Sequence, residues 1–457
     1  MDRRNRNEPK PRVSPWAALL VALLLLSPLG FYLAYVRGGE DDPGGGFPDP
    51  SDAPANLLGC PPIRDLGPVK ADTLEDQIDG VERAVERLRK LRSKRRVPIT
   101  LLSPEDVAAG LEGDQLKGLS KREIERDTRT LEILGVMPKG TDLEELAKQL
   151  TGQIIGYYDT DERELFVNAA SEEEVLPPLG ELTLAHELEH AIADQTFGLP
   201  LGLKAPPSKA DATLAKRSLV EGDATLLMRH YATSVLTPRQ LGEIQSDPTA
   251  ETALEGLEDI PPAIELLFGF PYTHGLAFAC ELFAEGGWRA VDNAYERPPS
   301  TTAQVMFPLR YREREGAVHV RAFGDLDEPW RRLGGSAIGA ADLFALFSAP
   351  GGETRRALDD PTAAASGWAG GSVEVWARGE VSALGLALAE RDPEDHLCDS
   401  VHGWYRASFP ETTPAPEQPG DAMVVKGRGR VAVLRCPGSE VRLGIGPTRP
   451  TARALIE

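Results

Sequence analysis

The chain has 457 residues, more than a single hydrophobic core usually supports, so we expect two or three domains. Hydrophobic residues make up 41% of the sequence and charged residues 26%, which is typical of a folded protein. The formal net charge of -21 argues against a nucleic-acid partner, because binding to phosphates requires a basic surface.

The N-terminal segment predicts a membrane anchor. Residues 1–15 are rich in arginine, residues 16–36 carry no charge, and Glu40, Asp41 and Asp42 follow. As a helix the uncharged run is about 32 Å long, which matches the hydrocarbon core of a bilayer. This charge pattern predicts a cytoplasmic tail, a single-pass transmembrane helix and an extracytoplasmic bulk at the cell membrane. The alternative is a protein secreted after signal cleavage, but no small-x-small cleavage site follows the apolar run.

Residues 37–70 are rich in Gly, Pro and Asp, and we interpret them as a flexible linker. Apolar residues then recur at spacings of three and four from Leu74 to Leu88 and predict an amphipathic helix. The basic run that follows, residues 89–96, is interpreted as a solvated helix end without a function. The next predicted elements are a strand over 97–102, a helix start at 103–106, a helix over 121–134 and a β-hairpin over 154–168.

The four cysteines of an exported chain can form disulfides. Cys398 and Cys436 are the expected pair. Cys280 lies in an apolar helical pattern and is expected to be a buried free thiol.

Residues 183–195 read T-L-A-H-E-L-E-H-A-I-A-D-Q and predict a metal-binding helix. His186 and His190 lie four residues apart, so on a helix they share one face and supply two ligands of a tetrahedral zinc site. Glu187 is placed to act on water as a general base rather than to bind the metal. The alternative is a surface helix with two unrelated histidines. Since the chain has 7 histidines, the pattern arises by chance only about once in a hundred such sequences, which favours the metal site.

A catalytic zinc site needs a third protein ligand, and Glu221 is the candidate. It lies in L-V-E-G-D-A-T, within a helix predicted over 209–233 that would return antiparallel to the first. Gly222 would let these two helices approach closely enough for the carboxylate to reach the metal. On this helix Asp223 and His230 would point away from the site. Asp194 shares the His190 face of the first helix and could orient a histidine by accepting a hydrogen bond from its ring.

The motif Glu221-Gly222-Asp223-Ala224 resembles the third-ligand helix of gluzincins, the thermolysin-like zincin metallopeptidases. Strands and a hairpin followed by the metal helix resemble the N-terminal half of a zincin. This resemblance implies that one hairpin strand binds the substrate backbone. Thermolysin-type enzymes carry an Asp four residues after the ligand Glu, whereas Thr225 stands here, so that outer contact is in doubt. A metzincin is excluded, because no histidine follows His190 closely.

Residues 270–275 read F-P-Y-T-H-G and predict a turn before an apolar helix over 276–284. Tyr272 and His274 are candidate donors to the oxyanion formed at a scissile carbonyl, and the alternative is ordinary packing in a loop. The chain resembles exported bacterial zincin-like proteins of unassigned substrate in several motifs, namely this run, G-Y-Y-D at 156–159, G-G-W at 286–288 and P-P-S at 298–300. The resemblance covers about residues 97–310.

Beyond residue 310 glycines cluster, and strands are predicted over 318–323, 373–377 and 431–434. Four tryptophans are expected to pack a smaller α+β region there, namely Trp330, Trp368, Trp376 and Trp404. The remaining histidines show no ligand spacing and are interpreted as incidental, namely His319, His396 and His402.

Together these features predict an α+β protein with a zincin-like domain over 71–310, in which a small mixed sheet and the active-site helix precede a helical second half. A C-terminal α+β region of unknown role follows over 311–457. The expected function is a membrane-anchored extracytoplasmic zinc metallopeptidase acting on a protein or peptide substrate. One alternative is a catalytically inactive, zinc-stabilised envelope protein with a binding or structural role. A second is a membrane-tethered interaction protein whose C-terminal region holds a partner.

Overall fold

The computed structural model describes residues 60–61, 63, 66–102, 120–143, 145–146, 156–168, 175–200, 205–247, 260–321, 323–349, 358–392, 394 and 396–457. The predicted tail and anchor, most of the predicted linker and the predicted helix start at 103–106 lie outside these residues. No helix within the described ranges is both long and apolar enough to cross a membrane.

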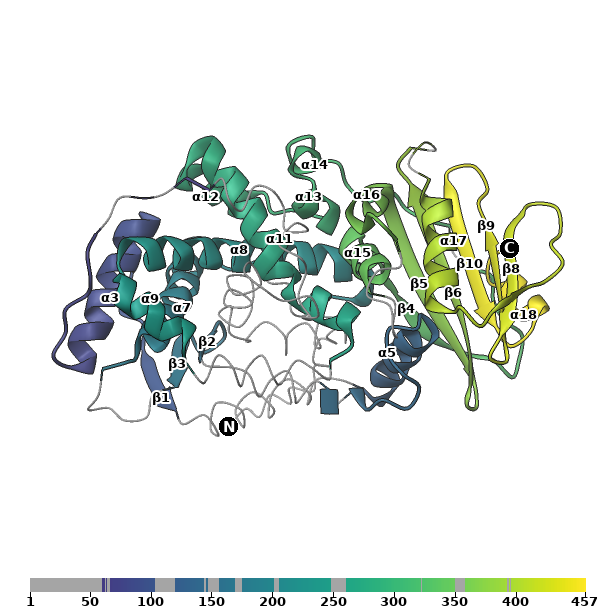
Figure 1. The fold of residues 1–457 in the computed structure, drawn as a ribbon, viewed down its shortest axis with the longest axis horizontal. Coiled ribbons are helices and arrows are strands. Elements are labelled where there is room, and N and C mark those ends of the chain that lie inside the picture. The colour runs from purple at the N-terminus through teal and green to yellow at the C-terminus, as the bar shows by residue number, and fades with distance from the viewer. Residues whose placement is uncertain are drawn as a thin grey trace, which may run out of the picture.

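The fold is mixed α and β: helices dominate up to residue 312, and a large sheet dominates after residue 331 (Figure 1). The described elements of the first part are α3 (Leu74–Arg89), β1 (Ile99–Leu102), α5 (Lys121–Ile133), β2 (Gly156–Asp159), β3 (Glu164–Asn168), α7 (Pro178–Phe197), η4 (Pro207–Lys209), α8 (Ala210–Ser234), α9 (Pro238–Gln245), α11 (Pro262–Gly286), α12 (Trp288–Glu296), α13 (Thr302–Met306) and α14 (Pro308–Arg312). Those of the second part are β4 (Arg331–Ala337), α15 (Ala340–Ser348), α16 (Pro361–Ser366), β5 (Trp368–Arg378), β6 (Val381–Glu390), α17 (Leu397–Ser408), β7 (Thr413–Pro414), β8 (Asp421–Gly427), β9 (Arg430–Arg435), β10 (Glu440–Gly446) and α18 (Arg449–Ala454).

A small sheet with strand order β1-β3-β2 lies in the first part. β3 pairs in parallel with β1 and antiparallel with β2, so β2 is an edge strand. The predicted hairpin is confirmed within residues 156–168, and the strand predicted over 97–102 is found at Ile99–Leu102. α7 packs against β2 and β3, which places the histidine-bearing helix directly on this sheet.

α8 and α11 cross with their backbones in contact. A Cβ atom on Gly222 would lie 2.1 Å from the carbonyl oxygen of Gly275, and a Cβ atom on Gly275 would lie 2.2 Å from that of Ser218. Neither glycine therefore has room for a side chain. The sequence predicted a close helix approach at Gly222, but with α7 as the partner. That expectation was wrong, because the helix in contact with Gly222 is α11.

The turn predicted over 270–275 was also wrong, because these residues lie inside α11. Pro271 lacks a backbone N–H and usually ends a helix. Here the residues around it are buried, including Phe270 and Phe278, and the burial of these large side chains outweighs one lost hydrogen bond. The helix predicted over 276–284 is the second half of this longer helix.

The second part is built on an antiparallel sheet with strand order β4-β5-β6-β10-β9-β8-β7. Alternate residues of β5 face two separate cores: Val375 packs into the main core, and Trp376 packs with Leu455 and Ile456 at the C-terminus. The strands predicted over 373–377 and 431–434 are confirmed as parts of β5 and β9. The strand predicted over 318–323 was wrong: the described residues there are irregular, although the Val318 N–H donates to the carbonyl of Ala369.

α5 joins the two parts of the chain. It begins at a capping box made by Ser120 and Glu123, and it packs against β4, β5 and β6 (Figure 1). Arg129 on this helix donates to the Ser382 hydroxyl at 2.7 Å and to the Gly379 carbonyl at 3.0 Å. A single apolar core also extends from α3 to β10, so the sheet and the helices support each other.

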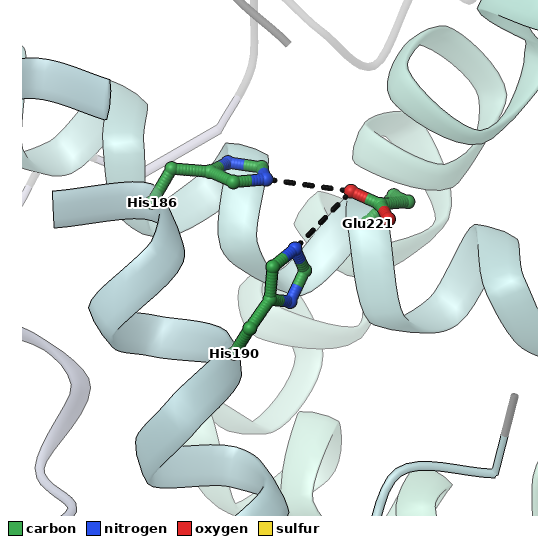
Figure 2. Close-up of side chains that lie close together, drawn as sticks. All are labelled: His186, His190 and Glu221. Carbon is green, nitrogen blue, oxygen red and sulfur yellow. Dashed lines mark ion pairs between the residues drawn. The ribbon is translucent and has the colours of Figure 1, made fainter. Parts of the chain in front are cut away.

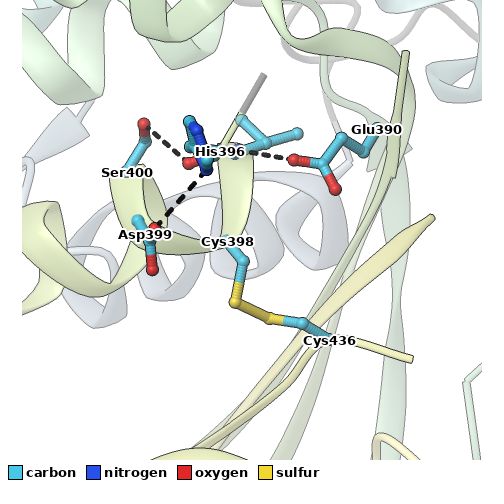
Figure 3. Close-up of a disulfide and its surroundings, with 7 residues drawn as sticks. Glu390, His396, Cys398, Asp399, Ser400 and Cys436 are labelled. Carbon is cyan, nitrogen blue, oxygen red and sulfur yellow. Dashed lines mark hydrogen bonds and ion pairs between the residues drawn. A yellow bond between two sulfur atoms is a disulfide. The ribbon is translucent and has the colours of Figure 1, made fainter. Parts of the chain in front are cut away.

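Two disulfides link distant segments. The predicted pair Cys398–Cys436 is confirmed and joins the first turn of α17 to the residue after β9 (Figure 3). The free thiol predicted at Cys280 was wrong, because Cys280 is bonded to Cys60. Apolar surroundings suit both a buried thiol and a buried disulfide, so the local sequence does not distinguish them. The partner lies 220 residues away in sequence. Figure 3 also shows His396 beside Asp399 at the start of α17, with 3.8 Å between Nδ1 of the histidine and Oδ2 of the aspartate.

The contact between α8 and α11 predicts opposite effects of two glycine substitutions. Gly222→Ala should reduce the free energy of unfolding by at least about 2 kcal/mol, because the two helices must move apart. Gly242→Ala on α9 should increase it by about 0.5–1 kcal/mol, because that helical position has open space around it. Chemical denaturation followed by circular dichroism measures both values. Equal effects at the two positions would contradict the close helix contact.

Candidate metal centre

α7 is buried on all sides rather than on one face. Every residue from Leu179 to Ala193 is buried, because the helix packs against β2 and β3, α3 and α8. His186 is 1% exposed and His190 7%. The alternative of a surface helix carrying two unrelated histidines is therefore wrong. Buried imidazole nitrogens need hydrogen-bond partners or a metal ion, so the groups around these two rings are candidate parts of a functional site.

The partner of both rings is Glu221 (Figure 2). Its Oε2 lies 3.3 Å from Nε2 of His186 and 3.3 Å from Nε2 of His190. All three potential ligand atoms lie within 4.8 Å of one another, so this buried group could hold a metal ion. Ligand atoms placed about 2.0–2.1 Å from a tetrahedral ion lie about 3.3 Å apart, and the two measured separations match this value. The antiparallel return of the second ligand helix, α8, brings the predicted ligands together.

The charges of the group suit a cation. Burial lowers the pKa of His186 to about 4, so this ring is neutral, as a ligand must be. Burial alone would raise the pKa of Glu221, but His190 and His186 outweigh it and lower this pKa to about 2. Burial alone would lower the pKa of His190, but Glu221 outweighs it and raises this pKa to about 10. Without a metal, the protonated His190 is the positive partner of the Glu221 carboxylate.

Glu187 lies beside the ligand group and is held by the edge strand. Its Oε2 accepts a hydrogen bond of 3.0 Å from the backbone N–H of Tyr158 in β2. Burial raises the pKa of Glu187 to about 8, with His190 opposing the rise and Glu221 adding to it. A carboxyl group that gains and loses a proton near neutral pH is suited to general acid and base chemistry.

The same hydrogen bond shows which edge of β2 faces the site. Leu165, the residue opposite Tyr158, donates its N–H to the carbonyl of Pro98 on the other side of β3. Tyr158 and Leu165 are therefore a pair without mutual hydrogen bonds, and the backbone groups of Tyr158 point away from β3. This edge of β2, which pairs with no other strand in the described ranges, thus faces α7 and Glu187.

Tyr272 and His274 lie in different surroundings. The Tyr272 side chain is buried and hydrogen-bonds to Glu221; burial first, and then the charges of Glu221 and Glu187, raise its pKa well above the ordinary value. The His274 ring instead stacks on Phe270 at 4.6 Å and meets Phe344 edge-on at 5.1 Å. Residues two apart on a helix point about 200° apart, so only Tyr272 joins the metal group.

An acidic neighbour of His190 was missed by the sequence analysis. Oε2 of Glu189 lies 3.8 Å from Nδ1 of His190. Asp194, the expected acceptor, instead accepts a hydrogen bond of 3.0 Å from the Tyr158 hydroxyl. The distance between Glu189 and His190 is too long for a hydrogen bond, so Glu189 acts on His190 through its charge, which helps to raise the pKa of His190.

Glu189 belongs to a buried charge cluster, which we name the Arg89 cluster and which consists of Arg89, Glu189, Asp223, Asp292 and Tyr295. Arg89 binds Asp223 with two N–O distances of 2.8 and 2.9 Å and Asp292 with one of 2.7 Å, and it lies 3.4 Å from Glu189. The Tyr295 hydroxyl donates to Asp223 at 2.9 Å. The interpretation of Arg89 as part of a solvated helix end was therefore wrong, because its side chain is fully buried. Asp223 points away from the metal group, as predicted.

No family model, no curated protein and no solved structure matches this chain. Inference about its function therefore depends on the residues of the site itself.

The ligand group predicts how metal content responds to substitution. The full-length protein purified in detergent should bind one divalent ion per chain, and His186→Ala, His190→Ala and Glu221→Gln should each remove it, because each change deletes one of three ligands. Elemental analysis after dialysis measures the stoichiometry. His396→Ala, at an exposed histidine, is the control and should retain the ion. Retention in all three ligand variants would exclude this site.

The Arg89 cluster predicts a large effect on stability. Arg89→Met should lower the free energy of unfolding by about 3–5 kcal/mol, because it leaves buried carboxylates without their positive partner. Arg92→Met, at an exposed arginine three residues later, should change it by less than about 0.5 kcal/mol. Urea denaturation of the two variants compares them. A small effect of Arg89→Met would mean that the cluster does not hold the helices together.

Proposed function

We propose that this protein is a membrane-anchored extracytoplasmic zinc metallopeptidase of the gluzincin type, with His186, His190 and Glu221 as ligands and Glu187 as the general base. The observation that carries the proposal is the buried group of three ligand atoms with a second carboxyl beside it. Two imidazoles and one carboxylate are donors that catalytic zinc sites use, with a further position left for water or substrate. A site for magnesium or calcium would instead be built from oxygen ligands.

A zinc ion held by this group would polarise a peptide carbonyl and lower the pKa of water toward about 7. Glu187 would take the proton from the attacking water and pass it to the leaving amine. The Tyr158 N–H occupies Oε2 of Glu187, so we assign the proton transfer to Oε1. The raised pKa of Glu187 supports this role, because the group must both accept and release the proton.

Two further features support a peptide substrate. The carbonyl of Tyr158, on the edge of β2 that points away from β3, could accept a hydrogen bond from an extended peptide, as in recognition by strand addition, while the Tyr158 N–H stays on Glu187. That strand would run past Glu187 and deliver a peptide bond to the ligand group. The Tyr272 hydroxyl hydrogen-bonds to Glu221, and by turning from that carboxylate it could donate to an oxyanion at the scissile carbonyl.

The proposed location outside the cytoplasm is supported by the two disulfides, Cys60–Cys280 and Cys398–Cys436. Disulfides form and persist in oxidising compartments and are rare in the cytosol. Together with the uncharged run over 16–36, they favour an exported protein that stays anchored in the cell membrane. Secretion after cleavage of that run is the alternative.

A second candidate is an envelope protein in which zinc only stabilises the helices. It is favoured by the burial of the whole group, since His186 is 1% exposed and Glu187 5%. Structural zinc sites are closed to solvent, whereas catalytic sites keep one position open.

A proteolysis assay separates the two candidates. The zinc-loaded full-length protein should cleave an unfolded protein such as casein, and Glu187→Gln should reduce the rate about 10²–10⁴-fold while retaining the metal. Glu162→Gln makes the same chemical change at an exposed position in the β2–β3 turn and should leave the rate unchanged. A chelator should abolish cleavage.

Activity that survives in Glu187→Gln would exclude Glu187 as the base. A folded protein that carries zinc and cleaves no substrate would favour the structural role.

A further inference from the structure

Arg217 is a buried arginine whose guanidinium has no hydrogen-bond partner among the residues that the structure describes. It is 1% exposed, and Nε and both terminal nitrogens lack such a partner. Buried arginines elsewhere in the chain are paired: Arg89 binds Asp223, Arg126 binds Asp127, and Arg310 binds the carbonyl of Trp368. Burying an unpaired charge is costly, so the position of Arg217 requires an explanation.

Its place on α8 directs Arg217 toward the metal group. Arg217 lies four residues before Glu221, so the two side chains share one face of the helix. Its charge interacts with Glu221 on the same helix and with Tyr272 on α11. The backbone contact at Gly222 and Gly275 fixes α8 against α11 and so sets the positions of the two helices that carry these side chains.

The charge balance leaves Arg217 available for a ligand. With a divalent ion bound, the Glu221 carboxylate would offset one of its two positive charges, and the Arg217 guanidinium would still have no acid hydrogen-bonded to it among the described residues. A guanidinium presents its N–H donors in a planar fork that matches a carboxylate with two parallel hydrogen bonds. In a site shielded from water such a charged pair is stronger than on a surface.

We propose that Arg217 binds a carboxylate of the substrate, so that the site selects peptides with a negative charge close to the bond that is cleaved. This inference rests on the proposed peptidase function. The carboxylate has two sources, the C-terminus of a peptide or an acidic side chain within one. The first source makes the protein a carboxyl-terminal exopeptidase, and the second makes it an endopeptidase that cleaves beside acidic residues. Because Arg217 is buried, the site must open before the ligand enters, so slow association is expected.

Peptide binding tests this without relying on catalysis. The probes are three short peptides acetylated at the N-terminus: Ala-Phe-Ala with a free C-terminus, the same peptide as its amide, and Ala-Phe-Glu as its amide. Binding to full-length Glu187→Gln protein is measured by calorimetry, with zinc and without it. At least one carboxylate peptide should bind about tenfold or more tightly than the Ala-Phe-Ala amide. The carboxylate peptide that binds more tightly identifies the source.

Substitutions at Arg217 test whether this residue causes the preference for carboxylate peptides. Arg217→Met should abolish it, and Arg217→Lys should retain part of it, because lysine keeps the charge but not the fork. Lys216→Gln removes one positive charge at the neighbouring, partly exposed position and should leave the preference intact. The melting temperature of Arg217→Met should stay the same or rise, because the change removes an unpaired buried charge. If that variant does not fold, Arg217→Lys supplies the comparison.

The proposal is overturned if neither carboxylate peptide is preferred, or if the preference is unchanged in Arg217→Met. These outcomes are independent of the casein assay. A protein that cleaves casein but shows no carboxylate preference retains the peptidase function and loses this inference. A protein that shows the preference and cleaves nothing retains a carboxylate-binding site and loses the peptidase function.

Discussion

Arg89 joins the two helices that carry the candidate metal ligands, because it pairs with Asp223 on α8 and lies 3.4 Å from Glu189 on α7. α7 supplies His190 and, one residue earlier, Glu189, while α8 supplies Glu221 and, two residues later, Asp223. The two helices therefore meet twice, through the ligand group on one side and through the Arg89 cluster on the other. Since α3 contributes Arg89 and α12 contributes Asp292, four helices depend on one guanidinium.

This arrangement places more buried acids than arginines in one cluster, and the resulting repulsion between carboxylates is reduced when one of them is protonated. Arg89 faces three carboxyl groups, and burial together with the charge of Asp223 raises the pKa of Glu189 well above its ordinary value. The raised pKa favours the neutral form of Glu189, which limits the negative charge beside the ligand group. The lowered pKa of Glu221 favours its anionic form. The cluster thus sets the geometry and the charge of the site together.

The local part of the site could be predicted from the sequence, because helical periodicity relates residues that are close along the chain. The spacing of His186 and His190 and the opposite directions of Glu221 and Asp223 both follow from 3.6 residues per turn. Residues whose role depends on packing between distant segments were missed. Arg89 stands in a basic run that reads as a solvated helix end, and the partners that bury it lie more than a hundred residues further on.

The wrong predictions about the fold also arise from packing between segments that are distant in sequence. Proline and glycine over 270–275 favour a turn locally, but burial of α11 against α8 keeps the segment helical, and this decides which of Tyr272 and His274 reaches the site. Cys280 shows no local sign of Cys60, and Gly222 shows no local sign that its neighbour is Gly275 rather than α7. In each case the residue type indicated that a close contact or bond exists, but the nearby sequence did not identify the residue on the other side.

The Cys60–Cys280 disulfide bears on how far the protein can act from a membrane. It attaches residue 60 covalently to α11, the helix that carries Tyr272, so the folded part is fastened ahead of α3. If the predicted anchor ends at residue 36, the remaining tether spans at most about 80 Å when fully extended. The start of the folded part would then stay within that distance of the bilayer. Reduction of this one bond would lengthen the tether and let the folded part move further from the membrane.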